Sequence, residues 1–153
     1  MIIEDYIELQ KIREENTDKT IVFCSGSFDL PHAGHSLFLK NCKEYGDILV
    51  ASVGKDADIK KNKGEERPII EEGERLRIID EVEHVDYAFL TNSPEPNGHY
   101  LSPIEEIFKI LKPNIYVFNT DASYIEEREK LAREHDIEIK LLEEIRHFHQ
   151  LRS

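Results

Sequence analysis

The residues best suited to chemistry lie between residues 24 and 35. This segment holds two glycines, Gly26 and Gly34, and two histidines, His32 and His35, and it runs into a stretch with helical periodicity. Glycine lets backbone approach a ligand closely, and a helix start offers free N–H groups and the positive end of its dipole to an anion. Histidines three positions apart can lie on one side of a first helical turn and donate hydrogen bonds to phosphate oxygens. The segment therefore predicts an anion site suited to phosphate.

Basic residues gather a short way downstream. Between residues 55 and 67 stand Lys55, Lys60, Lys61, Lys63 and Arg67. The whole chain has a formal net charge of -12, which argues against a nucleic acid or an anionic membrane surface as a partner. A phosphate ligand therefore needs a local basic patch, and Lys63 and Arg67 are its favoured members. Lysine-rich loops are also often only solvated, and this alternative stays open, above all for Lys60 and Lys61.

The elements that must position these residues alternate in type. Strands are predicted over 20–24, 48–53, 85–90, 115–118 and 137–141, and helices over 4–15, 33–45, 71–82, 102–111 and 123–135. This order predicts an α/β fold, a doubly wound, Rossmann-like, five-stranded parallel sheet with helices on both faces. The half-polar alternation of the last strand predicts an edge position. Ligands of such sheets bind where the strand order reverses, so the loop after the first strand is the expected site.

Length and composition predict how the chain is organised. A chain of 153 residues suits one domain over 1–153, with 1–18 as an N-terminal helical appendage and 143–153 as a C-terminal tail. No apolar run approaches the roughly 20 residues of a membrane span, and acids stand where a secretory signal carries Lys or Arg. A soluble, cytoplasmic protein with no membrane partner is expected. The cysteines, Cys24 and Cys42, are expected to be reduced and packed in the core.

The loop after the first strand resembles a known signature. It matches G-x-F-D-x-x-H-x-G-H of the cytidylyltransferase-like nucleotidyltransferases at every fixed position, which are Gly26, Phe28, Asp29, His32, Gly34 and His35. Further family elements follow in order, namely Gly54-Lys55-Asp56, Arg67-Pro68-Ile69, Glu74-Arg75, Val85-Asp86-Tyr87, the strand after Lys112-Pro113, and Asp121. The resemblance covers residues 19 to 142. The superfamily includes glycerol-3-phosphate cytidylyltransferase, the ADP-heptose-forming enzyme and archaeal FAD synthase.

The resemblance implies a HIGH-type fold and transfer of CMP or AMP from CTP or ATP to a phosphorylated small molecule, of the glycerol-3-phosphate or sugar phosphate type, with release of pyrophosphate. It implies that His32 and His35 donate to the α-phosphate and that Lys63 assists them. The implied nucleotide-binding residues are Gly26, Ser27, Phe28, Asp29, Gly34, Arg67, Arg75 and Asp121. The resemblance also implies Mg²⁺ bound with the triphosphate and a homodimer. Asp29 is expected to hold the loop rather than to ligate the metal.

Several alternatives stay open at this point. Arg75 either binds phosphate or is an exposed helix residue, and Asp121 either meets a substrate or caps the next helix. The family's serine and threonine motif, which normally opens a final helix, would begin where this sequence stops at Arg152-Ser153. His147, His149 and Arg152 either substitute for it or form a charged tail.

The function itself has competing interpretations. A nucleotide-binding module of the same fold with little or no turnover is the main alternative to an enzyme. A histidine metalloprotein is the third class, suggested by His32-x-x-His35 and His147-x-His149. The choice between CTP and ATP stays open as well.

Overall fold

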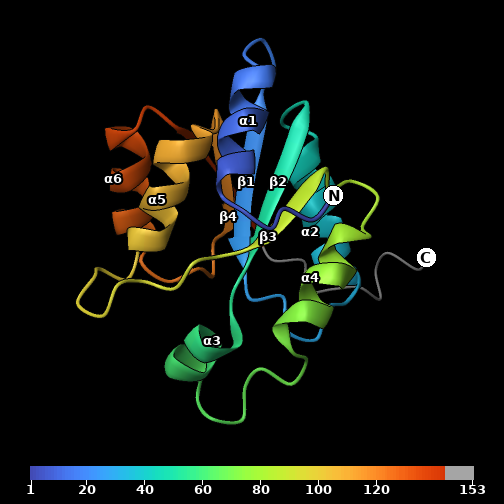
Figure 1. Cartoon of the computed structure of the whole chain (residues 1–153), viewed down its shortest axis with the longest axis vertical. Coiled ribbons are helices and arrows are strands. Elements are labelled where there is room, and N and C mark those ends of the chain that lie inside the picture. The colour runs from blue at the N-terminus through green and yellow to red at the C-terminus, as the bar shows by residue number, and fades with distance from the viewer. Residues whose placement is uncertain (144–153) are drawn as a thin grey trace.

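The computed structural model describes residues 1–143 (Figure 1). The helices are α1 (Ile7–Glu15), α2 (Ala33–Lys43), α3 (Asp56–Lys63), α4 (Glu72–Asp80), α5 (Ser102–Leu111) and α6 (Ile125–Glu134). The strands are β1 (Ile21–Gly26), β2 (Ile48–Val53), β3 (Tyr87–Leu90), β4 (Ile115–Asn119) and β5 (Glu138–Leu142). None of the described helices is long and apolar enough to cross a membrane.

The five strands form one parallel sheet in the order β3-β2-β1-β4-β5. This confirms the predicted doubly wound α/β fold and the edge position of the last strand. Cys24 of β1 stands between Ala51 of β2 and Val117 of β4, so the first strand lies in the middle of the sheet. From β1 the chain first adds β2 and β3 on one side of the sheet, and then crosses to add β4 and β5 on the other side. The strand order therefore reverses between β1 and β4.

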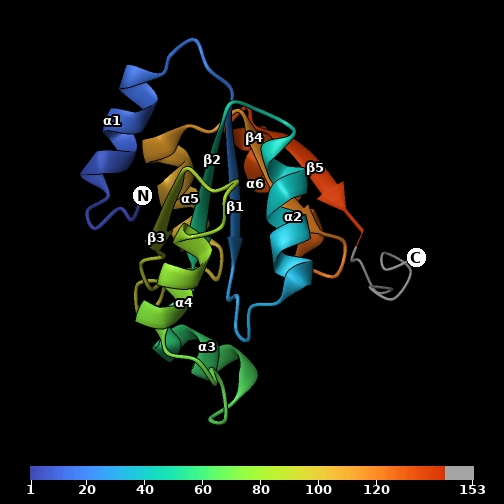
Figure 2. The same ribbon diagram turned by 90° about the vertical axis from the view of Figure 1, so that its right-hand side faces the viewer.

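Helices cover both faces of the sheet, and the strands alternate between two cores. α2 and α4 lie on one face, in front of the sheet in Figure 2, where Cys24 packs with Leu39 and Ile79. α1, α5 and α6 cover the other face, where Phe23 packs with Leu9 and other apolar residues of these helices. α1 therefore contributes Leu9 and Ile12 to this core. A strand buried on both faces reads as a continuous apolar run, which is why β1 was predictable.

The segment between β2 and α4 corrects a prediction. Sequence analysis predicted no helix between the strand over 48–53 and the helix over 71–82, and treated the lysines there as part of a loop. This prediction is partly wrong, because Asp56–Lys63 forms α3. Acids in its first turn and lysines in its last turn complement the helix dipole, and Gly64, with a φ of 102°, ends it. Ile59 is its single buried residue, so the helix lacks the apolar stripe by which sequence periodicity is recognised.

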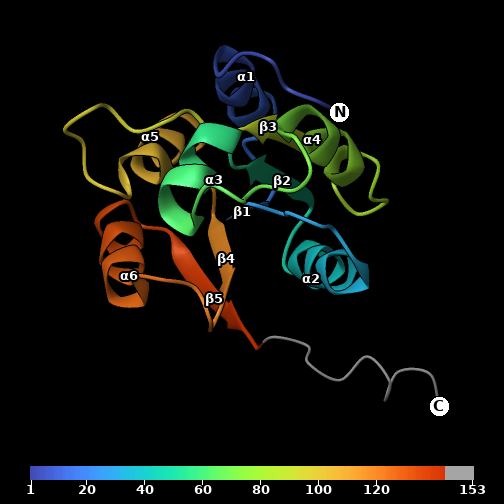
Figure 3. The same cartoon turned by 90° about the horizontal axis from the view of Figure 1, so that it is seen from below.

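The carboxyl ends of the strands share one edge of the sheet, which faces the viewer in Figure 3. The loop between β1 and α2, helix α3 and the loop between β4 and α6 all lie at this edge (Figures 1 and 3). It includes the position where the strand order reverses, and this is where parallel α/β sheets bind ligands.

Candidate functional site

The loop after β1 has a strained backbone. Phe28 and Leu30 both have a φ of 49°, in the left-handed region that non-glycine residues rarely adopt. The Phe28 ring is buried against the α2 face and folds back over Gly26, where an added Cβ would lie 3.0 Å from the ring. A side chain at position 26 would therefore crowd the Phe28 ring. Strain of this kind persists at sites where a fixed loop shape serves a ligand.

The two histidines cap α2 reciprocally. His32 is the N-cap residue, and its Nδ1 accepts a hydrogen bond from the Gly34 N–H at 2.9 Å. The Nδ1 of His35 accepts one from the His32 backbone N–H at 3.1 Å. The rings stack at a tilt with their centroids 4.2 Å apart. Because each Nδ1 accepts, each neutral ring carries its proton on Nε2, the nitrogen that can donate to a phosphate.

The surroundings of His35 favour its neutral form. Burial of the ring, the neighbouring His32 and the Lys63 ammonium all lower the pKa of His35 below 6.5. Near pH 7 His35 is therefore mainly an uncharged donor through Nε2–H.

A charge change at residue 63 should move this pKa. We expect Lys63→Met to raise the pKa of His35, because it removes a cation that disfavours the imidazolium. The measurement is a proton–nitrogen NMR titration of the histidine rings, with the exposed Lys61→Met as the matched control. A His35 pKa that responds equally to both substitutions, or to neither, would contradict the assigned neighbour.

Asp29 holds a second loop against the first. Its carboxylate accepts hydrogen bonds from the backbone N–H groups of Ile69 and Ile70 at 3.1 Å and pairs with Arg67 at 3.1 Å. Burial raises the pKa of the carboxyl, but the N–H groups of Ile70 and Ile69 and the Arg67 guanidinium outweigh burial, and the pKa lies below 3.8. Both oxygens of Asp29 are thus used within the protein, as expected for a residue that holds the loop.

The lowered pKa of Asp29 makes its contribution to stability depend on pH. Because the folded pKa lies below the unfolded one, the contribution is complete above about pH 4 and is lost as the pH falls through the folded pKa. We expect Asp29→Asn to lower the free energy of unfolding at pH 6, with a difference from wild type that shrinks towards pH 3. Urea unfolding across this range measures it, and the exposed Asp18→Asn is the control. A pH-independent difference would contradict the role of the ionised carboxylate.

Lys63 and Arg67, at the two ends of residues 63–67, both contact the histidine loop, which is the loop between β1 and α2 that leads to His32 and His35. Lys63, the last residue of α3, donates from Nζ to Ser27 Oγ at 3.0 Å, and Arg67 pairs with Asp29. The predicted residues Ser27, Asp29, Lys63 and Arg67 are thus brought together. The Lys63 and Arg67 side chains are exposed, whereas the Lys60 and Lys61 side chains form no hydrogen bond or ion pair with this loop among the described residues.

Arg75 is a buried clamp. It is 0% exposed, so the alternative of an exposed helix residue is wrong. Its guanidinium donates to the carbonyl oxygens of Ser27 at 2.6 Å and Gly54 at 2.8 Å and pairs with Asp56 at 2.7 Å. These contacts join the ends of β1 and β2 to the start of α3. The geometry therefore favours a role in positioning the phosphate-binding residues over direct phosphate contact.

The remaining predicted residues have different outcomes. Asp121 is exposed in the turn after β4, and α6 begins at Ile125 with Tyr124 as N-cap, so capping by Asp121 is wrong. Its contact with a substrate stays a prediction. His147 and His149, like Arg152, lie outside the described residues. Sequence reasoning assigned no role to Asp56, although it stands in the family element Gly54-Lys55-Asp56 that follows the second predicted strand.

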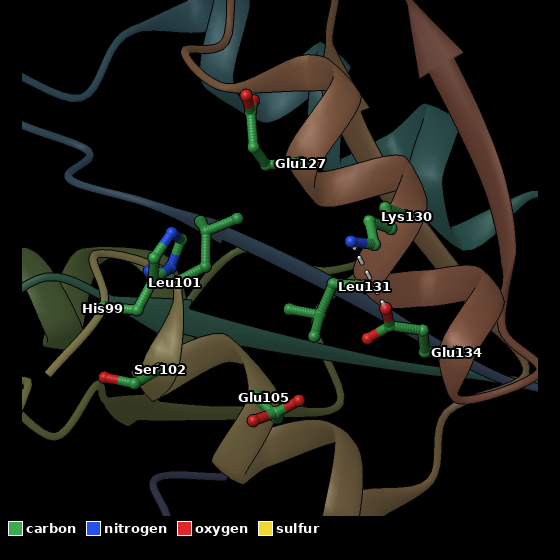
Figure 4. A pocket seen from close by; sticks show the side chains of 8 residues that line it. All are labelled: His99, Leu101, Ser102, Glu105, Glu127, Lys130, Leu131 and Glu134. Atoms are coloured by element: carbon green, nitrogen blue, oxygen red, sulfur yellow. Dashed lines mark hydrogen bonds and ion pairs between the residues drawn. The ribbon is translucent and has the colours of Figure 1, made fainter.

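A separate cavity lies between α5 and α6 (Figure 4). Its volume is about 290 Å³, and it is lined by His99, Leu101, Ser102, Glu105, Glu127, Lys130, Leu131 and Glu134. Lys130 and Glu134 form an ion pair across a turn of α6. None of the predicted site residues lines this cavity, so it is not the anion site.

The fold and the loop together define a class. A parallel sheet whose first strand runs into two histidines at the start of a helix, at the reversal of strand order, is the arrangement of the HIGH-type nucleotidyltransferases. A family model described as "Cytidylyltransferase-like" matches residues 23–148. The chain belongs to this family.

Individual relatives agree with this assignment. "Bifunctional protein HldE" of Aliarcobacter butzleri is 34% identical over 121 residues, which is 78% of this chain and 24% of the relative. The chain therefore spans about a quarter of that protein. The solved lipopolysaccharide core biosynthesis protein from Thermoplasma volcanium is 30% identical with a TM-score of 0.64, covering 82% of this chain and 95% of its own. Pantothenate synthetase from Thermus thermophilus is 16% identical with a TM-score of 0.66, and the match covers 93% of this chain and 61% of the synthetase chain. At this identity the similarity shows the fold alone.

Proposed function

We propose that the protein transfers CMP or AMP from CTP or ATP to a phosphorylated small molecule and releases pyrophosphate. The observation that carries this proposal is the reciprocal cap of His32 and His35. It fixes both rings with the proton on Nε2 at the start of α2, beside the reversal of strand order. Two donors held in this way suit a phosphate whose charge grows during transfer.

The residues around the histidines support the same chemistry. Lys63 and Arg67 add two cations that Ser27 and Asp29 hold at the loop, and the α2 N-terminus adds its dipole. These groups favour a triphosphate lying along the loop, with the α-phosphate at the histidines. An acceptor phosphate is already anionic near neutral pH, so the site needs no strong general base. Positioning in line and neutralisation of charge can supply the catalysis.

Mg²⁺ fits this arrangement as a companion of the nucleotide. No group of three histidine, cysteine, aspartate or glutamate side chains within residues 1–143 could hold a metal ion. Mg²⁺ often keeps several waters and binds through substrate phosphates, where it neutralises charge on the triphosphate. In the proposed complex phosphate oxygens and water would hold the Mg²⁺, while Lys63 and Arg67 would bind the phosphates directly.

A sugar phosphate is the favoured acceptor class. The similar protein from Thermoplasma volcanium is described as acting in lipopolysaccharide core biosynthesis, and lipopolysaccharide cores are built of sugars. The similarity to HldE covers only about a quarter of that protein, so it supports a nucleotidyltransferase domain and not a particular product.

One panel tests the proposal. Pyrophosphate release is measured for CTP and ATP, each with glycerol-3-phosphate, heptose-1-phosphate, phosphocholine, phosphoethanolamine and FMN, with Mg²⁺ present. We expect turnover with at least one pair, and loss of that turnover in His35→Ala. Calorimetric titration with each nucleotide runs beside it. Nucleotide binding without turnover across the panel would overturn the enzyme and favour the binding module, and absence of both would overturn the nucleotide site.

A further inference from the structure

Arg128 lies beside β4, on the face of the sheet opposite α2. It is on the first turns of α6, and its Nε donates to the Ser123 carbonyl oxygen at 2.7 Å. Its Nη1 donates to the Tyr116 hydroxyl at 2.7 Å, and its guanidinium lies 5.8 Å from the centre of the Phe118 ring. Three contacts from β4 and the following loop thus fix the guanidinium of a half-buried side chain.

The Tyr116 hydroxyl connects Arg128 to the histidine loop. Tyr116 is fully buried on β4, and the Ser25 side chain is a polar neighbour of its hydroxyl. Ser25 is the residue before Gly26, at the end of β1. Burial raises the pKa of Tyr116, so its phenol keeps its proton while its oxygen accepts from Arg128. A continuous chain of polar groups therefore runs from β1 across β4 to α6.

Within residues 1–143 the charge of Arg128 is not paired with a carboxylate. Arg67 and Arg75 each pair with an aspartate, but Arg128 pairs with no carboxylate among residues 1–143, and its Nη2 donates no hydrogen bond there. This is unexpected in a chain with 32 acids and 20 lysines and arginines. A partly desolvated charge without a counter-ion is costly unless an anion completes it. The Arg128 guanidinium is thus held in a fixed position, and among residues 1–143 no anionic group neutralises its charge.

We propose that Arg128 binds a phosphate group of a substrate through Nη2. The inference rests on the proposed function, because the site at the histidines already accounts for one phosphate and Arg128 lies on the α6 side of the same edge. Guanidinium groups suit phosphate oxygens because of their planar, multi-donor geometry. Two sources share this chemistry, the phosphate of the acceptor and the triphosphate of the nucleotide, and kinetics can distinguish them.

The main test compares three variants of the full chain. Arg128→Gln removes the charge, Arg128→Lys keeps the charge but loses the planar group, and Arg133→Gln makes the same charge change at an exposed position on α6. We expect Arg128→Gln to raise one KM by about tenfold or more, the range expected for losing a hydrogen bond to a charged group. Arg128→Lys should recover part of this loss, and Arg133→Gln should leave both KM values unchanged.

The identity of the affected KM assigns the phosphate. An increase in the acceptor KM alone assigns it to the acceptor, and an increase in the nucleotide KM alone assigns it to the triphosphate. Equal KM values in wild type and Arg128→Gln would overturn the proposal while leaving the proposed function intact. A lower kcat with unchanged KM, equal in Arg128→Gln and Arg128→Lys, would also overturn it, because that pattern indicates a structural role.

A second measurement does not need turnover. Inorganic phosphate is titrated into His35→Ala, into His35→Ala with Arg128→Gln, and into His35→Ala with Arg133→Gln, and binding is followed by phosphorus NMR. We expect the variant without Arg128 to bind phosphate at least about threefold more weakly than the other two. If wild type turns over no substrate pair, the proposed function fails and this titration still decides Arg128. Equal phosphate binding by all three variants overturns the proposal.

Discussion

Replacing either histidine of the α2 cap by alanine is expected to lower kcat by about 10²- to 10³-fold, the range seen when a donor to a developing charge is removed. The physical reason is the fixed Nε2–H of each ring, which follows from the bonds that the two Nδ1 atoms accept. His32→Ala should also destabilise the protein by about 1 kcal/mol, because it removes the N-cap of α2. The measurements are steady-state kinetics on the productive substrate pair and thermal unfolding.

A second substitution at position 32 separates catalysis from capping. Serine is a good N-cap residue but cannot reach as far as the imidazole Nε2. His32→Ser should therefore keep most of the stability that His32→Ala loses and show the same fall in kcat. Recovery of kcat in His32→Ser would assign His32 to the cap alone, and rates within a few-fold of wild type in His35→Ala would overturn the catalytic role of His35.

The fold was largely predictable because its signals are local. The central strands are continuous apolar runs, since both of their faces are covered, and turn residues separate them from the helices. α3 was missed for the opposite reason. It buries only Ile59 and is held by contacts from elsewhere, including the bond from the Asp56 N–H to Glu72 at its first turn. A helix stabilised from outside leaves little periodicity in its own sequence.

The candidate site also contains residues that local sequence signals identify and residues whose contacts they do not reveal. His32 and His35 were identifiable because their spacing and their place after β1 are sequence features. The surroundings of Arg75 were not, because Ser27, Gly54 and Asp56 lie 48, 21 and 19 residues away from it in the sequence. Arg75 meets carbonyl oxygens of Ser27 and Gly54, and backbone carbonyls carry no residue-type signal.

Removal of Arg75 is expected to lower the free energy of unfolding by about 3 kcal/mol, the lower end of the range for breaking a buried ion pair. Arg75→Met would leave the carbonyl oxygens of Ser27 and Gly54 without their buried donor and would leave Asp56 unpaired. The lower end applies because the Asp56 side chain is 30% exposed and water can solvate it in part. The measurement is urea unfolding at pH 7 with wild type in parallel.

Arg75 should affect substrate binding through Lys63. Its contacts fix the start of α3, whose last residue donates to Ser27, so a displaced α3 removes a cation from the loop. We therefore expect Arg75→Met to raise the nucleotide KM as well, and Arg75→Lys to restore only part of both losses, because an ammonium cannot span three partners as a guanidinium does. Arg77→Met, which breaks an exposed pair with Glu81 on the same helix, should change stability by less than about 0.5 kcal/mol. A fully stable Arg75→Met with a raised nucleotide KM would instead indicate direct phosphate contact, because a clamp cannot be removed without cost to the fold.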